Sequence, residues 1–284
     1  MRRALVIAIA LSAAALTVVF AAGEVLSRPA AARVGPPPTD LGALEISLDT
    51  DAGGSVSGWY VPGEPGAGAV LLLHDIRGDR RQMSGRARFL RRAGYSVLLI
   101  DLPAHGQSSG SRLSFGVREA AGVRAALSYL YEQRPAGRTA VLGVSLGAAA
   151  FVLAHAAPAP AAVVLESMYP TIEDAVANRL SMRFGWVGAS ATPLLLWQLP
   201  VWAGVSARDL RPIADLERVR APLLLVSGTH DRHTPWAETE RLFAAANQPK
   251  ELWAIEGAAH VDLHAFAPDR YEARVLNFFA RHLR

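Results

Sequence analysis

The sequence predicts an α/β fold: a mostly parallel sheet of eight strands with helices on both faces and a cap insertion between the sixth and seventh strands. Three observations predict it. Short apolar runs alternate with helical segments over residues 44–284, and the central runs are continuous in apolar residues, as in strands covered on both faces. A glycine-flanked serine also lies between one such run and a small-residue helix. Strands separated by helices favour a parallel sheet with right-handed crossovers.

Length and composition agree with one large domain. The chain has 284 residues, of which 51% are hydrophobic and 19% are charged, so a sizeable core is expected and wholesale disorder is not. The net charge of +4 comes from scattered arginines without interleaved aromatics, so no nucleic-acid partner is expected. The absence of cysteine excludes disulfides and thiolate chemistry. No feature of the sequence defines an oligomeric state.

Residues 1–23 predict a targeting segment, because Arg2 and Arg3 precede a stretch without charge. Two interpretations stay open. An uncleaved transmembrane helix of about 20 residues would anchor the chain, with the rest of it outside the cytoplasm because the arginines stay inside. A signal peptide would instead be cleaved near residues 19–23 and leave a secreted or periplasmic protein. The length of the apolar stretch favours the anchor.

The segment that follows predicts a linker, and the folded domain is expected to start after it. Residues 24–43 are rich in alanine and proline, including three prolines at 36–38, which stiffen a linker. The domain is then expected over residues 44–284. Its first two strands, at 44–48 and 55–61, alternate apolar and polar side chains around a Gly-Gly turn, which predicts an antiparallel hairpin at a sheet edge.

Apolar runs predict the other strands, and helical segments follow them. The strands are expected at residues 70–73, 97–100, 139–142, 163–165, 223–226 and 251–255. The helices are expected at residues 81–93, 115–131, 148–156, 236–246 and 268–283. The alternation breaks between about residues 168 and 213, where tryptophans and leucines are interrupted by glycine and proline. This stretch is expected to cap the carboxyl edge of the sheet.

Residues 143–147 read Gly-Val-Ser-Leu-Gly, and this pattern between a strand and a helix predicts a nucleophile elbow at Ser145. A serine hydroxyl needs a base that is oriented by an acid. Asp231 and His260 follow in that order, each just after an expected strand. Because the carboxyl ends of parallel strands meet at one edge of a sheet, we expect these three residues to form a catalytic triad.

Other residues compete for these roles. Glu166 also ends a strand after the elbow and is the alternative acid. His264 lies four residues after His260, as in a metal-binding pair, but a third ligand is missing, so neither a metal nor another cofactor is expected. The remaining histidines near strand ends are expected to order loops: His74, His105, His230 and His233.

A serine nucleophile also needs donors for the oxyanion of its tetrahedral intermediate. The backbone N–H of Leu146, the residue after the nucleophile, is the first expected donor. The second comes from the loop at residues 74–78, where Ile76 is the leading candidate and Asp75 the next.

Taken together, these stretches resemble the α/β-hydrolase superfamily from about residue 44 to the end. The resemblance is carried by residues 71–78, 101–108, 143–147, 165–167, 228–231 and 257–260. Within the superfamily, the chain is similar to membrane-tethered or secreted serine hydrolases near lysophospholipases and prolyl-oligopeptidase-type peptidases. The resemblance implies the fold and the triad, with Asp231 rather than Glu166 as the acid. One departure is the pair His74-Asp75, where the family usually has His-Gly, and a side chain there narrows the oxyanion pocket.

The expected activity is that of a serine hydrolase that cleaves a carboxylic ester or thioester through an acyl-enzyme. The apolar insertion favours a lipid or other acyl substrate, with Trp186, Trp197 and Trp202 as contacts. The same side chains would also suit the core of a cap or a membrane surface. Two alternatives are a small-substrate serine peptidase of the same fold and a non-enzymatic scaffold. All three triad residues are present, which favours an enzyme.

Overall fold

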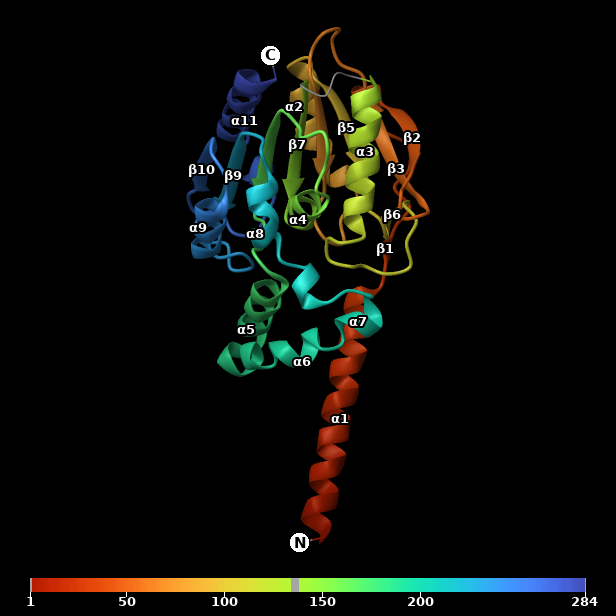
Figure 1. The fold of residues 1–284 in the computed structure, drawn as a ribbon, viewed down its shortest axis with the longest axis vertical. Coiled ribbons are helices and arrows are strands. Elements are labelled where there is room, and N and C mark those ends of the chain that lie inside the picture. Colours follow the sequence, from red (N-terminus) through yellow and green to blue (C-terminus); the bar gives the residue numbers. More distant parts are fainter. Residues whose placement is uncertain (1, 134–137, 284) are drawn as a thin grey trace.

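A computed structural model describes residues 2–133 and 138–283 of the protein (Figure 1). Within these residues one sheet of eight strands forms the centre of the molecule. In spatial order the strands are β10 (Lys250–Ile255), β9 (Leu223–Gly228), β8 (Ala162–Glu166), β7 (Thr139–Val144), β4 (Ala69–Leu73), β5 (Ser96–Ile100), β3 (Ser55–Val61) and β2 (Leu44–Asp49). The strands from β10 to β5 are parallel, whereas β3 is antiparallel to both β5 and β2. The predicted fold class is therefore confirmed.

Helices cover both faces of this sheet, which explains the continuous apolar runs. The covering helices are α2 (Ser84–Arg92), α3 (Glu119–Gln133), α4 (Leu146–Leu153), α9 (Trp236–Ala245) and α11 (Pro268–His282). Strand β4 is buried along its whole length. Leu71 and Leu73 pack in one cluster with α3 and α4, while Val70 and Leu72 pack in the other with α2 and α11. Because strand side chains alternate between faces, a strand between two helical layers must be apolar throughout.

The third helix begins later than its sequence pattern predicts. The expected helix starts at residue 115, but α3 starts at Glu119. Phe115 and Gly116 have φ angles of 58° and 130°, which a right-handed helix excludes. The Glu119 carboxylate accepts hydrogen bonds from the backbone N–H groups of Ser114 and Gly116, at 2.9 and 2.8 Å. A buried side chain therefore holds the turn that delays the helix.

At the N-terminus, α1 (Arg2–Ser27) is a single helix that projects from the body of the molecule (Figure 1). It extends four residues beyond the predicted targeting segment, which ends at residue 23. Among the described residues, no helix combines the length and the apolarity needed to cross a membrane. The transmembrane prediction for residues 1–23 therefore has no support here.

The segment predicted as a linker is part of the folded domain. Strand β1 (Ala30–Ala31) pairs in parallel with β6 (His105–Gly106). Val34 and Leu41 are buried, with exposed fractions of 6% and 1%. The structure thus corrects the linker prediction for residues 24–43. Composition misled because the backbone hydrogen bonds from Ala30 and Ala32 to Ala104 and Gly106 need no particular side chain.

Between β8 and β9 the chain leaves the sheet and forms a helical insertion, residues 168–213. Its elements are α5 (Ile172–Ser190), α6 (Thr192–Leu196), α7 (Leu199–Trp202), a 3₁₀ turn (Ala207–Asp209) and the start of α8 (Pro212–Asp215). Gly185, with φ of 63°, kinks α5. Helices α6 and α7 contact α1 and lie with α5 at the end of the molecule from which α1 projects (Figure 1).

Candidate active site

Ser145 occupies a strained turn between β7 and α4. Its φ and ψ angles are 49° and −106°, an unfavourable region for a residue with a side chain. The flanking glycines make the turn sterically feasible. A Cβ atom on Gly143 would lie 2.8 Å from the backbone N of Ala148, and one on Gly147 would lie 2.6 Å from the carbonyl oxygen of Leu73. These approaches explain why the sequence pattern requires glycine on both sides of the serine.

Asp231 and His260 form a direct pair on the two loops that follow β9 and β10. His260 Nδ1 lies 2.7 Å from Asp231 Oδ2, and both side chains are largely shielded from solvent. With Asp231 ionised, Nδ1 carries the proton and Nε2 keeps its lone pair. This is the arrangement that a general base requires.

The loop around Asp231 stabilises the charged carboxylate. Its Oδ1 accepts from the backbone N–H groups of His233 and Thr234 at 2.8 and 2.9 Å, and its Oδ2 accepts from the Thr234 hydroxyl at 2.8 Å. Burial alone would raise the pKa of Asp231, but the hydrogen bond and charge of His260, together with Thr234, hold this pKa below its ordinary value. Asp231 therefore stays ionised beside the imidazole.

The loops after β4, β7 and β10 meet at one edge of the sheet. Val144, the residue before the elbow serine, lines a small cavity together with Asp75 and His260. On the other side of the turn, Ser145 lines a second cavity with Ile76. The predicted nucleophile and the predicted acid–base pair thus lie on neighbouring loops at the carboxyl edge of the sheet, as the strand order requires.

Asp75 occupies a position between the predicted oxyanion donor and the predicted base. Its Oδ1 accepts from the backbone N–H of Ile76 at 2.5 Å, and its Oδ2 lies 3.8 Å from His260 Nε2. Gln82 Oε1 accepts from the backbone N–H of Asp75 at 2.9 Å and orders the start of this loop. The N–H that the sequence assigns to the oxyanion is therefore already bonded to a carboxylate.

Glu166, the alternative acid, is hydrogen-bonded to two buried side chains from other elements. Arg86 Nη2 donates to its Oε2 at 2.7 Å, and the Tyr271 hydroxyl donates to its Oε1. Arg86 also bonds to Asp262 at 2.9 Å. This buried cluster ties β8 to α2 and α11, which gives Glu166 a structural partner in place of a histidine.

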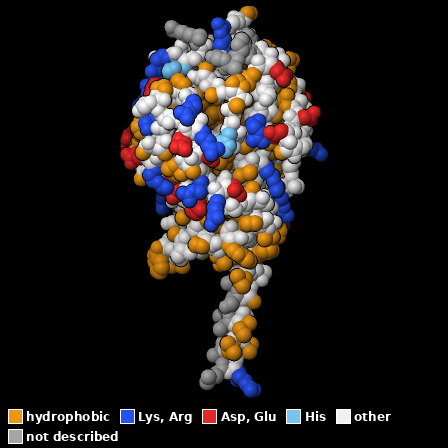
Figure 2. All heavy atoms as spheres, viewed as in Figure 1, with side chains coloured by type: hydrophobic (Ala, Val, Ile, Leu, Met, Phe, Trp, Pro, Cys, Tyr) orange, Lys and Arg blue, Asp and Glu red, His pale blue; other side chains and the backbone are white. Residues whose placement is uncertain are grey.

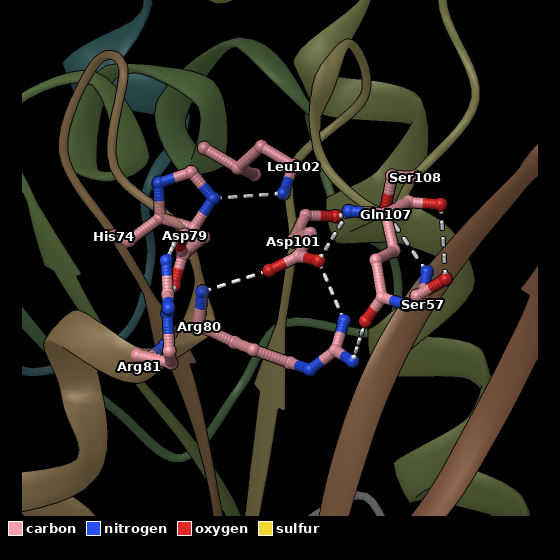
Figure 3. A network of polar contacts seen from close by, with 9 residues as sticks. All are labelled: Ser57, His74, Asp79, Arg80, Arg81, Asp101, Leu102, Gln107 and Ser108. Atoms are coloured by element: carbon pink, nitrogen blue, oxygen red, sulfur yellow. Dashed lines mark hydrogen bonds and ion pairs between the residues drawn. The ribbon is translucent and has the colours of Figure 1, made fainter. Parts of the chain in front are cut away.

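A second buried network holds the loop at residues 74–78 against the loop after β5 (Figure 3). His74 Nε2 accepts from the backbone N–H of Leu102 at 3.0 Å, and its Nδ1 lies 2.7 Å from the Asp75 carbonyl oxygen. Arg80 donates from its backbone and its side chain to Asp101, at 2.7 and 2.5 Å. Burial, followed by the charge of His105, lowers the pKa of His74 to about 3. A neutral His74 thus orders the loop, as expected from the sequence.

The other histidines have varied surroundings. His264 Nε2 lies 3.0 Å from Glu272 Oε1. The ring of His233 lies 4.8 Å from that of His260, between centroids, so this loop histidine packs directly against the candidate base. Among residues 2–133 and 138–283, no cluster of three or more histidine or acidic side chains is arranged to hold a metal ion.

The cavity beside Ser145 is apolar and has a volume of about 140 Å³. The insertion contributes Leu195, Leu196, Leu199 and Trp202 to its lining, and α1 contributes Gly23, Leu26 and Ser27. Of the three tryptophans predicted as substrate contacts, Trp202 lines this cavity. Trp186 and Trp197 do not line it and are 81% and 72% exposed. The sequence does not predict that α1 lines this cavity. Its apolar residues give no information about which distant segment they pack against.

Comparisons with known proteins identify the family. Residues 70–274 match the profile of the alpha/beta hydrolase family, and the chain belongs to that family. It is similar to the uncharacterised protein Rv2307c of Mycobacterium tuberculosis, with 31% identity over 250 residues, 85% of this chain and 80% of that protein. The uncharacterised protein YqkD of Bacillus subtilis is 23% identical over 230 residues, 80% of this chain and 75% of YqkD.

Solved structures show the same fold. The Pyrococcus furiosus esterase Pf2001 superimposes with a TM-score of 0.73 at 23% identity, covering 90% of this chain and 98% of that one. The esterase EaEST from Exiguobacterium antarcticum gives 0.62 at 13% identity, covering 84% and 100%. These identities establish a likeness of fold, so the chemistry must be argued from the site itself.

Proposed function

We propose that the protein is a serine hydrolase that cleaves carboxylic esters through an acyl-enzyme, with Ser145, His260 and Asp231 as its triad. The observation that carries the proposal is the 2.7 Å Asp231–His260 pair on the same sheet edge as a serine held at a φ of 49°. The family membership and the esterases of the same fold support a hydrolytic reaction.

The proposed reaction follows from the protonation state of the pair. His260 Nε2 takes the proton of the Ser145 hydroxyl as its oxygen attacks the ester carbonyl, and Asp231 stabilises the imidazolium. The ester C–O bond then breaks, and the leaving alcohol receives the proton from His260. Water attacks the acyl-serine in the same way and releases the carboxylic acid. No cofactor takes part in these steps.

The oxyanion would be held by the backbone N–H groups of Leu146 and Ile76, each worth about 3 kcal/mol in the transition state. In the resting site the Ile76 donor is bonded to Asp75, so this side chain must turn away when substrate binds. The apolar lining beside Ser145 supports a substrate with an acyl chain, because such a cavity favours apolar groups over charged ones.

Active-site labelling tests the nucleophile. A fluorophosphonate probe should label the intact protein and fail to label Ser145→Ala, with Ser167→Ala as a matched serine control that keeps the label. An unlabelled parent would instead favour a scaffold that retains the fold.

A substrate panel tests the reaction class. We expect p-nitrophenyl acetate and octanoate to be hydrolysed, with Asp231→Asn lowering kcat by about 10⁴-fold because the imidazole tautomer is lost. The panel includes p-nitrophenyl palmitate, a thioester and a peptide amide. Turnover of the amide without any ester would replace the esterase proposal by a peptidase.

A further inference from the structure

The insertion exposes several large apolar side chains, which we call the apolar band. It lies at the end of the molecule from which α1 projects, where Figure 2 shows hydrophobic side chains gathered. Its members are Phe184, Trp186, Val187, Leu194, Trp197 and Val201. All are exposed, including Phe184 at 67% and Val201 at 61%. Large apolar patches on a folded domain mark an interaction surface.

The nearby helix α1 exposes apolar side chains in several directions. Leu5, Val6, Ile7 and Ile9 have exposed fractions between 59% and 64%. Successive helical residues are rotated by about 100°, so these side chains point to different sides of α1. A protein groove would cover one side of such a helix, whereas the lipids at a bilayer surface can contact several sides of it. Arg2 and Arg3 are exposed at its tip, where they suit polar lipid headgroups.

The C-terminal part of α1 is fixed to the insertion and to the loop after β4. Gln198 Nε2 donates to the Val19 carbonyl at 2.9 Å, and the rings of Phe20 and Trp202 lie 4.7 Å apart. Arg77 Nη2 donates to the Val25 carbonyl at 2.8 Å. The exposed part of α1 and the apolar band therefore belong to one surface, joined by a groove of about 580 Å³ that Leu16, Phe20, Leu194 and Trp197 help to line.

The same junction forms a wall of the cavity beside Ser145. Gly23 and Leu26 of α1 line that cavity together with Leu199 and Trp202 of the insertion. Gly23 packs so closely that an added Cβ would lie 2.3 Å from Gln198 Oε1. Removal of α1 would therefore open the cavity, which makes this helix a structural part of the candidate active site.

We propose that α1 and the apolar band bind a lipid bilayer, and that the cavity beside Ser145 takes an amphiphilic ester from that surface. The substrate part rests on the proposed esterase activity, whereas the binding part does not. Tryptophans favour the interface between headgroups and acyl chains, and they are the most exposed members of the band. Because α1 and the insertion also line the cavity beside Ser145, that cavity would lie next to the bilayer when both are bound to it.

Binding is tested on the full chain carrying Ser145→Ala, so that turnover plays no part. We expect it to cosediment with vesicles of phosphatidylcholine containing a minority of phosphatidylglycerol. Adding Trp186→Ser and Trp197→Ser should weaken binding by roughly tenfold or more, because two apolar anchors are lost. Leu44→Ser is the matched control: it removes an exposed apolar side chain on the edge strand β2, 58% exposed, and should leave binding unchanged.

Fluorescence gives an independent measurement of the contact. Brominated acyl chains should quench the tryptophan emission of the Ser145→Ala chain, and Trp186→Phe with Trp197→Phe should remove most of the quenching while the surface stays apolar. A chain that remains in the supernatant, or whose emission brominated lipid leaves unchanged, would overturn the proposal. So would equal loss of binding in Leu44→Ser.

Activity separates the two proposals. On an otherwise unchanged chain, Trp186→Ser with Trp197→Ser should leave hydrolysis of soluble p-nitrophenyl acetate within about twofold and lower hydrolysis of a monoacylglycerol in vesicles by roughly tenfold. Lipid binding without any ester turnover would refute the esterase function alone. Ester turnover without lipid binding would refute the surface alone.

Discussion

At the scale of single residues, Asp75 adds a charged group beside the proposed triad. Its carboxylate accepts from Ile76 N–H at 2.5 Å and lies 3.8 Å from His260 Nε2. A negative charge at this point would oppose the proposed oxyanion and compete for its proposed donor, the Ile76 N–H. The resting site is therefore held in a form from which Asp75 has to move.

Removing the side chain should release this restraint. We expect Asp75→Ala to raise kcat on p-nitrophenyl acetate by roughly tenfold, because it frees the Ile76 donor and removes the opposing charge. Asp75→Asn is the matched variant: its amide oxygen still accepts from Ile76, so the increase should be smaller. Steady-state kinetics of the parent, Asp75→Asn and Asp75→Ala should give kcat values that rise in that order. A lower kcat in Asp75→Ala than in the parent would show that the carboxylate assists the reaction.

At the scale of the elements, the turn between β7 and α4 depends on close backbone contact. A Cβ on Gly147 would lie 2.6 Å from the Leu73 carbonyl oxygen and 2.7 Å from that of His74. Both oxygens belong to the backbone at the end of β4, so neither can rotate away. The position of Ser145 is therefore set jointly by two neighbouring strands.

Gly147→Ala should push these strands apart. We expect it to lower the thermal midpoint by several degrees, as for a loss of about 2 kcal/mol, and to reduce fluorophosphonate labelling of Ser145. Gly35→Ala provides the comparison: Gly35 has open space around its Cβ position, so its substitution introduces only the backbone strain of a φ of 77° and no steric clash. Equal midpoints for the two variants would contradict the steric explanation.

The helices are held to the sheet by a buried ion pair as well as by apolar packing. Arg86 of α2 donates to Glu166 at the end of β8 at 2.7 Å and to the hydroxyl of Tyr271 of α11 at 3.0 Å. Three elements thus depend on one guanidinium. A buried carboxylate that loses its partner is costly, even where the intact pair adds little net stability.

We expect Arg86→Met to lower the free energy of unfolding by about 3–5 kcal/mol, because Glu166 is left buried without its cation. Combining it with Glu166→Leu should recover much of the loss. Urea unfolding of the single and double variants measures both effects. Arg88→Met removes an exposed partner of Asp40 and should change little; if it were as damaging as Arg86→Met, burial would not be the cause.

At the scale of the whole molecule, buried histidines make the fold sensitive to acid. The pKa of His74 is lowered from 6.5 to about 3, and burial also lowers the pKa of His105. Below pH 6.5 the unfolded chain binds more protons at these positions than the folded one. These histidines therefore contribute their full share to the free energy of unfolding above the unfolded pKa, and this contribution is lost as the pH falls below it.

Neutral His74 should contribute up to about 1.4 kcal/mol per pH unit to this loss between pH 6 and 5, because its folded pKa lies well below that range. The lowered pKa of His105 changes the stability in the same direction. Urea unfolding at pH 7, 6 and 5 measures the slope for the parent and for His74→Asn. The variant is expected to be less stable at pH 7 and to show a shallower slope. An unchanged slope would assign the acid sensitivity to other groups.

Much of the fold was predictable because its determinants are local. Apolar runs, glycine positions and the order of Ser145, Asp231 and His260 along the chain depend on short stretches of sequence, and strand periodicity places their ends at one edge of a sheet. The start of α3 was missed because Glu119 bonds back to the preceding turn, and the linker prediction failed because β1 pairs through backbone groups that composition does not reveal.

The sequence by itself determined the α/β class, the eight strands, and which residues compete for catalysis. Only the tertiary structure decided that Glu166 pairs with Arg86, that Trp186 and Trp197 face outward, and that α1 forms a wall of the cavity. The physical reason is that the first set depends on side-chain periodicity and local turn geometry, whereas the second depends on contacts between segments 50 to 180 residues apart, such as Val19 with Gln198 and Val25 with Arg77.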